Sequence, residues 1–412
     1  MPDNQPARLH VSTDPGELGL DRQRLERIEQ RLARFVDEGR LPGWQVVVSR
    51  HGQVGYLCHY GRRDVARDLP IEPDTMYRIY SMTKPITAVA AMMLIERGEL
   101  LLTDPIADWL PEFAEPRVYV GGSDQAPATV PSREPIRVWH LLTHTSGLTY
   151  GFLRGHPVSM RYLAAGLDEL GSADATLAEL CRGWAAQPLV FEPGREWQYS
   201  VSLDVLGRLV EVISGQSLDA FFAQHILGPL GMPDTHFTVP ADKRDRVAEL
   251  YQATPDGFAP ATRMAAGAFT PGWPSGGGGL TSTAHDYWRF TQFLLGGGRL
   301  DGVRLLAPST VAMMRRNYLP GNQDLASFGR PLFAESPMYG VGFGLGMSVT
   351  IDPAAAGIAA SVGDFGWGGL ASTAFTIDPE LDLTFEFYTQ LVPSSALPIR
   401  PLLRQLVHQA LS

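Results

Sequence analysis

The most constraining feature of this chain is the segment Thr83 to Glu96 (TKPITAVAAMMLIE), which is apolar almost all the way round when it is drawn as a helix. A surface helix carries one polar face, so this pattern predicts a helix that is buried on most sides. The fold must therefore surround it, and Gly98 is placed to end it. Pro85 is tolerated only in the first turn of a helix, which puts Ser81 at or just before the helix start.

Ser81 and Lys84 stand three residues apart there, so their side chains can meet. The positive end of the helix also favours an anion that develops beside the serine. Only two of the chain's 34 basic residues are lysines. Arginine cannot release its proton in a protein, whereas a lysine whose pKa is lowered by burial can act as a base beside a hydroxyl. A Ser-x-x-Lys pattern alone can arise by chance, but this context favours both residues as catalytic.

Two further segments carry residues suited to the same chemistry. Tyr199 follows a Pro-Gly turn within Phe191 to Ser200 (FEPGREWQYS). A neighbouring ammonium favours the phenolate, so Tyr199 could take the Ser81 proton; the alternative is a half-buried packing residue. Gly366 to Leu370 (GWGGL) leads towards a predicted strand. Its glycines either let the backbone come close to a ligand or form a β-bulge.

In this order, the three segments resemble those of the serine β-lactamase and penicillin-binding protein superfamily. Ser81-Met82-Thr83-Lys84 is similar to its S-x-x-K motif. Tyr199-Ser200-Val201 stands where class C β-lactamases have Tyr-Ala-Asn or Tyr-Ser-Asn, and Trp367-Gly368-Gly369 stands where they have Lys-Thr-Gly. The Trp-Gly-Gly form is similar to that of family VIII carboxylesterases, which are esterases on the class C fold. His140 to Leu148 and Gly277 to Thr283 also match, so the resemblance spans roughly residues 20 to 411.

The resemblance implies a β-lactamase/transpeptidase-like fold of the α/β (α+β) class, with an antiparallel sheet flanked by helices and a mainly helical lobe. Residues 1–105 and 270–412 would form the α/β lobe, residues 106–269 the helical lobe, and the active site would lie between them. Local patterns predict helices or strands in the following ranges: helix around 25–35, strands 44–50 and 54–60, helices 204–213 and 218–226, strands 373–377 and 381–388, and a helix over 398–411.

The same resemblance assigns roles to individual residues. Ser81 would attack an ester carbonyl, and Lys84 and Tyr199 would share the proton transfer. The backbone N–H groups of Ser81 and Leu370 would form the oxyanion hole. The substrate pocket is predicted to include four residues: Val201, Trp367, Gly368 and Gly369.

Two departures from the β-lactamase pattern bear on the substrate. Val201 replaces the asparagine used on a β-lactam side-chain amide, and Trp367 replaces a cationic lysine, so a β-lactam carboxylate loses its charged partner. We therefore expect a serine carboxylesterase that hydrolyses short- to medium-chain esters through an acyl-enzyme on Ser81, with weak β-lactam hydrolysis. The alternatives are a β-lactamase, a peptidase acting on D-amino acids or an acyltransferase, and, outside enzymes, a binding protein that acylates without turnover.

No metal or cofactor site is indicated by the sequence. His140 and His144 could share a helix face, but there is no H-E-x-x-H motif, and both fall in a segment that resembles a structural one in the superfamily. Cys58 and Cys181 have neither the spacing of a zinc site nor the density of a disulfide scaffold, so we expect packed thiols. The glycine run at 276–279 lacks the lysine of a phosphate loop.

The net charge of the chain limits the kinds of molecule that it can bind. A formal net charge of −10 disfavours nucleic acid or an anionic membrane surface. The polar first nineteen residues contain no apolar core of a signal peptide, and no apolar run is long enough to span a bilayer. We therefore expect a cytoplasmic protein with a small-molecule ester substrate; the sequence does not indicate an oligomeric state.

Overall fold

The computed structural model describes residues 8–167, 175–265, 272–330 and 338–412. Its main sheet has eight strands in the order β12-β13-β14-β15-β16-β1-β2-β3, and every neighbouring pair is antiparallel. The strands are β1 (Gly43–Arg50), β2 (Gln53–Asp64), β3 (Leu69–Pro70), β12 (Val341–Phe343), β13 (Ser348–Thr350), β14 (Phe365–Gly368), β15 (Ala374–Asp378) and β16 (Leu383–Tyr388). The two ends of the chain therefore share one sheet, which is joined where β1 pairs with β16.

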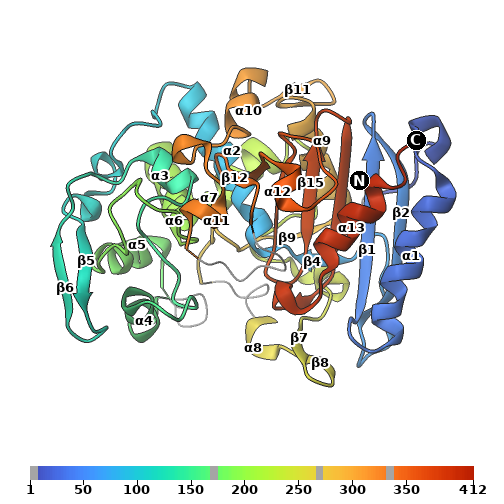
Figure 1. Cartoon of the computed structure of the whole chain (residues 1–412), viewed down its shortest axis with the longest axis horizontal. Coiled ribbons are helices and arrows are strands. Elements are labelled where there is room, and N and C mark those ends of the chain that lie inside the picture. Colours follow the sequence, from blue (N-terminus) through green and yellow to red (C-terminus); the bar gives the residue numbers. More distant parts are fainter. Residues whose placement is uncertain (1–7, 168–174, 266–271, 331–337) are drawn as a thin grey trace.

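One face of this sheet is covered by the first and last long helices, α1 (Arg22–Asp37) and α13 (Ile399–His408), which contact each other (Figure 1). Leu25, Ile28 and Leu32 form a buried stripe on α1, as their helical spacing predicted. They share a hydrophobic cluster with side chains of β1, β16 and α13. Burying each such side chain contributes about 1.5–3 kcal/mol, which is enough to fix both helices on the sheet.

The other side of the sheet carries α9 (Ala284–Leu295), which packs on β15 and β16, and beyond it the helix α2 (Thr83–Glu96). The α2 helix begins and ends at the predicted residues, and every position from Thr83 to Leu94 is buried. The all-round apolar pattern is thus explained by α2 running through the middle of the molecule, between the sheet and α6 (Figure 1).

The remaining helices gather mainly on the far side of α2 from the sheet (Figure 1). They are α3 (Val138–Leu142), α4 (Pro157–Ala164), α5 (Leu177–Ala185), α6 (Ser202–Ser214) and α7 (Leu218–Phe222), with α8 (Thr262–Ala265), α10 (Pro308–Met314), α11 (Leu325–Phe328) and α12 (Pro353–Ala356) elsewhere. The predicted helix 204–213 is confirmed as α6. The predicted helix 218–226 is α7 continued by a π-helical turn, Ala223–Leu227.

Four small sheets complete the described fold. They pair β4 (Met76–Arg78) with β9 (Thr281–Thr283), β5 (Arg117–Gly122) with β6 (Pro127–Pro131), β10 (Arg299–Leu300) with β11 (Val303–Arg304), and β7 (Tyr251–Thr254) with both β8 (Gly257–Pro260) and β17 (Leu391–Val392). The β4–β9 pair matters most for the site, because β4 runs directly into the Ser81 turn and β9 follows the glycine run. Over the described ranges, no helix is both long and apolar enough to cross a membrane.

Candidate active site

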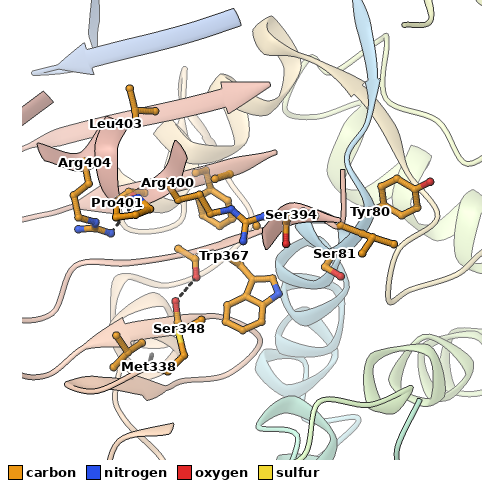
Figure 2. A pocket seen from close by; sticks show the side chains of 18 of the residues that line it. Tyr80, Ser81, Met338, Ser348, Trp367, Ser394, Arg400, Pro401, Leu403 and Arg404 are labelled. Carbon is orange, nitrogen blue, oxygen red and sulfur yellow. Dashed lines mark hydrogen bonds between the residues drawn. The ribbon is translucent and has the colours of Figure 1, made fainter. Parts of the chain in front are cut away.

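Ser81 lies in a single 3-10 turn, Tyr80–Met82, that leads directly into α2. This is the location at the helix start that Pro85 predicted. The preceding residue, Tyr80, has a φ of 44°, a left-handed conformation that costs a non-glycine residue about 1–3 kcal/mol. The turn is held from behind by Tyr287, whose hydroxyl donates to the Met82 carbonyl over 2.8 Å. Ser81 thereby faces a cavity of about 210 Å³ (Figure 2).

Lys84 is fully buried beneath Ser81. Its Nζ donates to Ser81 Oγ at 3.0 Å, to the Tyr150 hydroxyl at 3.1 Å and to the Gly277 carbonyl at 2.6 Å. These three acceptors match the three hydrogens of an ammonium group. If the lysine is neutral, it keeps two hydrogens for Tyr150 and Gly277 and turns its lone pair towards Ser81. The geometry therefore suits a group that exchanges one proton with the serine.

Tyr199 approaches Ser81 from the other side. Its hydroxyl donates to Ser81 Oγ over 2.6 Å, and Lys84 Nζ lies 4.5 Å from the centre of its ring. Hydroxyl hydrogens rotate freely, so the short contact can carry a proton in either direction. Ser81 Oγ is thus in direct contact with both groups that the sequence predicted as its proton partners.

Trp367, on β14, lines the cavity and also contacts this proton network. Its indole Nε1 donates to the Tyr199 hydroxyl over 3.2 Å, and its ring packs against Tyr199 at 5.6 Å and Phe343 at 5.2 Å. The sequence suggested only that Trp367 shapes the pocket. The structure adds that the indole gives Tyr199 a neutral hydrogen-bond donor at the motif position where a lysine would bring a positive charge.

Gly368 and Gly369, the two residues after Trp367, line the cavity. Neighbouring atoms of the protein leave no room for a side chain at either position. A Cβ on Gly368 would lie 2.4 Å from Cζ of Arg400, and one on Gly369 would lie 2.4 Å from the Ile79 carbonyl. The strand end can therefore press against the segment that carries Ser81. Leu370 follows at the cavity wall, and within the described ranges its amide has no backbone acceptor.

Val201 lies elsewhere. It caps the start of α6, is 3% exposed and belongs to the hydrophobic core, and it is not among the described residues that line the cavity. The prediction that Val201 forms part of the substrate pocket is therefore corrected. Val201 is two residues after Tyr199, and its side chain belongs to the core at the point where the chain enters α6.

Two buried residues of the site were missed by sequence reasoning. Tyr150 contacts Lys84. The only feature of the sequence that could have indicated this role is its position, two residues after the matched segment His140 to Leu148. Asp204 on α6 accepts from Ser275 Oγ at 2.6 Å and from the Gly277 amide at 2.8 Å, which fixes the glycine whose carbonyl binds Lys84. Burial raises the pKa of Asp204, and the charge of Lys84 opposes that effect.

The two histidines weighed as metal ligands have structural contacts instead. His140 Nδ1 accepts from the Arg137 amide, and burial lowers the pKa of His140 to about 3. His144 lies beyond the end of α3, so the two rings do not share a helix face. His144 contacts Ser200 Oγ at 3.1 Å and packs on Tyr199, and burial, with the charge of Lys84, lowers its pKa well below 6.5. Among the described side chains, no three His, Cys, Asp or Glu residues are grouped as metal ligands.

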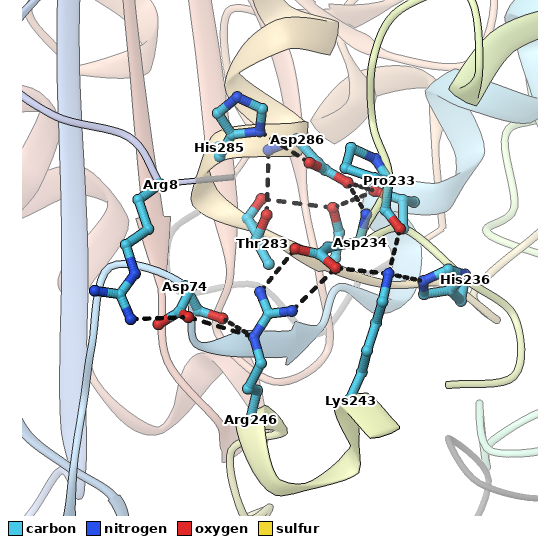
Figure 3. Close-up of polar contacts among 12 residues, drawn as sticks. Arg8, Asp74, Pro233, Asp234, His236, Lys243, Arg246, Thr283, His285 and Asp286 are labelled. Carbon is cyan, nitrogen blue, oxygen red and sulfur yellow. Dashed lines mark hydrogen bonds and ion pairs between the residues drawn. The ribbon is translucent and has the colours of Figure 1, made fainter. Parts of the chain in front are cut away.

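The second lysine, Lys243, lies in a separate ion-pair network (Figure 3). Its Nζ donates to the Pro233 carbonyl at 2.7 Å and pairs with Asp234 at 2.8 Å, and Arg246 forms two hydrogen bonds to the same carboxylate. The Lys243 side chain is 23% exposed, whereas Lys84 is fully buried. The chain therefore offers two lysines in contrasting environments, of which only Lys84 contacts Ser81.

Comparison with known proteins places this site in a family. The model of the family described as Beta-lactamase matches residues 28–409 of the chain. The chain belongs to the beta-lactamase family. This beta-lactamase-family serine hydrolase is 35% identical over 396 residues to Esterase EstB of Burkholderia gladioli, covering 91% of this chain and 92% of the esterase.

Two further relatives extend the comparison. Monacolin J acid methylbutanoyltransferase of Aspergillus terreus is 30% identical over 404 residues, covering 92% of this chain and 94% of the relative. The solved structure of EstCE1, a hydrolase with promiscuous acyltransferase activity, superposes with a TM-score of 0.78 at 28% identity, covering 94% of this chain and 99% of that one. The β-lactamase/transpeptidase-like fold predicted from the motifs is thus confirmed.

Proposed function

We propose that this beta-lactamase-family protein is a serine carboxylesterase of the family VIII type, which hydrolyses short- to medium-chain esters through an acyl-enzyme on Ser81. The observation that carries the proposal is the double contact of Ser81 Oγ, with Lys84 Nζ at 3.0 Å and the Tyr199 hydroxyl at 2.6 Å. The similarity to Esterase EstB supports it.

In the proposed reaction, Ser81 Oγ attacks the ester carbonyl while its proton passes to Lys84 or Tyr199. The backbone N–H groups of Ser81 and Leu370 bind the oxyanion, which is aided by the helix start beneath Ser81. The proton then moves to the leaving alcohol, and the acyl group stays on Ser81 Oγ. A water molecule attacks the acyl-enzyme with the same residues as base and acid, which releases the carboxylic acid and restores the serine.

The cavity bears on the substrate. Its volume is about 210 Å³, and apolar side chains such as Met338, Val341 and Ile358 form part of its wall. These features support a small apolar acyl or alcohol group. Trp367 brings no positive charge to Tyr199, which favours neutral esters over β-lactams with a carboxylate and leaves weak β-lactam hydrolysis as a side activity.

We also propose that the site lies between two lobes, one formed by residues 1–105 and 270–412 and the other by residues 106–269. The origins of the site residues support this division. Ser81 comes from the first lobe, and Tyr150 and Tyr199 come from the second.

Acyl transfer is the second candidate function, because two of the relatives are described as a methylbutanoyltransferase and a hydrolase with acyltransferase activity. The two reactions share the acyl-enzyme and differ only in whether water or another alcohol accepts the acyl group. Product analysis with an added alcohol separates them: a new ester as the main product would favour transfer.

The direct test compares wild type with Ser81→Ala on a short-chain p-nitrophenyl ester and a chromogenic cephalosporin. We expect ester cleavage by the wild type, slow or no opening of the lactam, and loss of both reactions in the variant. Ester cleavage that persists in folded Ser81→Ala would contradict the proposed nucleophile, and faster cleavage of the cephalosporin would favour a β-lactamase.

A further inference from the structure

Arg400, near the start of α13, lines the same cavity as Ser81, and its side chain lies near Trp367 and Ser394 (Figure 2). Its Nη2 donates to the Gly369 carbonyl at 2.7 Å and to the Thr373 carbonyl at 3.0 Å. Both carbonyls belong to the turn that joins β14 to β15 and carries Leu370. The guanidinium therefore binds the backbone of the proposed oxyanion hole from behind.

The peptide group that accepts from Arg400 is the one that presents the Leu370 amide. The Gly369 carbonyl and the Leu370 N–H are two ends of the same planar unit, so a donor at the oxygen draws electron density away from the nitrogen. Hydrogen bonds polarise one another in this way along a chain, and a charged donor has the larger effect. A polarised Leu370 N–H is a stronger donor to a developing oxyanion.

We propose that Arg400 is a positioning residue that orients the Gly369–Leu370 peptide and strengthens its N–H as an oxyanion donor. This role rests on the proposed function, because it needs a tetrahedral intermediate on Ser81. In this role, Arg400 on α13 acts on catalysis through the β14–β15 turn and does not contact the reacting atoms.

The packing of the turn supports this role. Its base is closed by the Gly369 amide, which donates to the Thr373 carbonyl at 2.8 Å. The lack of a side chain on Gly368 leaves the space that the Arg400 guanidinium occupies. On the opposite side, Gly369 lies against the carbonyl of Ile79, two residues before Ser81. Arg400 and Ile79 thus hold the turn between them and set the separation of the two proposed oxyanion donors.

The test replaces Arg400 by Gln, which retains hydrogen-bond donors and removes the charge. Loss of an oxyanion donor itself lowers kcat by about 10²–10³-fold, and Arg400 acts one step removed, so we expect a fall in kcat of about tenfold with KM nearly unchanged. Arg400→Lys keeps the charge and should retain more of the activity. A boronic acid forms a tetrahedral adduct with the serine, so its inhibition constant should rise in Arg400→Gln by a factor similar to the fall in kcat.

Arg50→Gln is the matched control. Arg50 also donates to backbone carbonyls, those of Leu18, Gly19 and Leu381 at 3.0–3.1 Å, but its contacts lie at the end of β1 away from the cavity. We expect it to lower the thermal stability without changing kcat or the boronic acid affinity. The comparison separates a general loss of guanidinium contacts from an effect on the oxyanion.

Two results would overturn the role of Arg400 in an active wild-type enzyme: a kcat for Arg400→Gln within twofold of wild type, or a fall in kcat with unchanged boronic acid affinity. A wild-type protein that neither cleaves esters nor binds the boronic acid would instead overturn the proposed function. The two failures are therefore distinguishable in one set of measurements.

Discussion

Trp367→Phe isolates the contribution of the indole N–H. The replacement keeps an aromatic ring next to Tyr199 and Phe343 and deletes only the donor that reaches the Tyr199 hydroxyl over 3.2 Å. If Lys84 takes the Ser81 proton and Tyr199 gives its own proton to the leaving alcohol, the Tyr199 oxygen becomes negative during the reaction. The lost hydrogen bond is then worth more in the transition state than in the ground state, and the variant should be slower.

The size of the effect follows from the difference between the two acceptors. A hydrogen bond to a neutral group contributes about 0.5–1.5 kcal/mol and one to a charged group about 1.5–3 kcal/mol. Only the difference, about 1–2 kcal/mol, enters the barrier, which corresponds to a fall in kcat of about 5- to 30-fold. KM should change little because the ring still lines the cavity.

The assay is the separate determination of kcat and KM on a p-nitrophenyl ester. Trp184→Phe is the control, since its buried indole N–H donates to the Leu167 carbonyl over 3.1 Å and neither residue lines the cavity. It should lose stability and keep its kcat. A kcat for Trp367→Phe within twofold of wild type, or a loss confined to KM, would refute the reasoning that Tyr199 gains negative charge next to the indole.

Two other substitutions test the buried ionisable groups. Lys84→Arg should lose at least about 100-fold in kcat/KM because arginine cannot act as a base. Lys243→Arg is the same change at a half-buried lysine in the separate ion-pair network and should stay near wild type. Equal rates in both variants would contradict the role of Lys84. Burial raises the pKa of Glu386 to about 8, so the folded protein binds a proton that the unfolded chain releases near pH 4.5, and stability should fall as pH rises between these values. Glu386→Gln should remove that loss of stability, which is on the order of a few kcal/mol at pH 9. If the variant keeps the wild-type difference in stability between pH 5 and pH 9, the pH dependence does not come from Glu386.

Patterns in the sequence predicted those features that depend on local spacing. The α2 helix was predicted because its apolar residues leave no polar face, and Ser81 and Lys84 were placed together by the helix period. Tyr199 and Trp367 were placed near them only through the resemblance to a family. Tyr199 is 118 positions from Ser81 and Trp367 is 168 positions from Tyr199, and no local rule brings residues so far apart into contact.

The parts that sequence reasoning missed depend on contacts between distant backbone groups. Asp204 binds an amide of the glycine run, and Arg400 binds the carbonyls of the β14–β15 turn, and neither kind of partner leaves a mark on side-chain patterns. The placement of Val201 in the substrate pocket was wrong for a related reason. Its place in the motif is shared with the family, but its side chain enters the core at the start of α6.

The central claim is that catalysis passes through an acyl group on Ser81. Intact-mass spectrometry of the wild type, quenched in acid during turnover of a slowly deacylating ester, tests it most directly. The account predicts a mass increase equal to one acyl group, located on the peptide that contains Ser81 and missing from Ser81→Ala. Turnover by the wild type with no covalent adduct under these conditions, or an adduct that persists in Ser81→Ala, would contradict it.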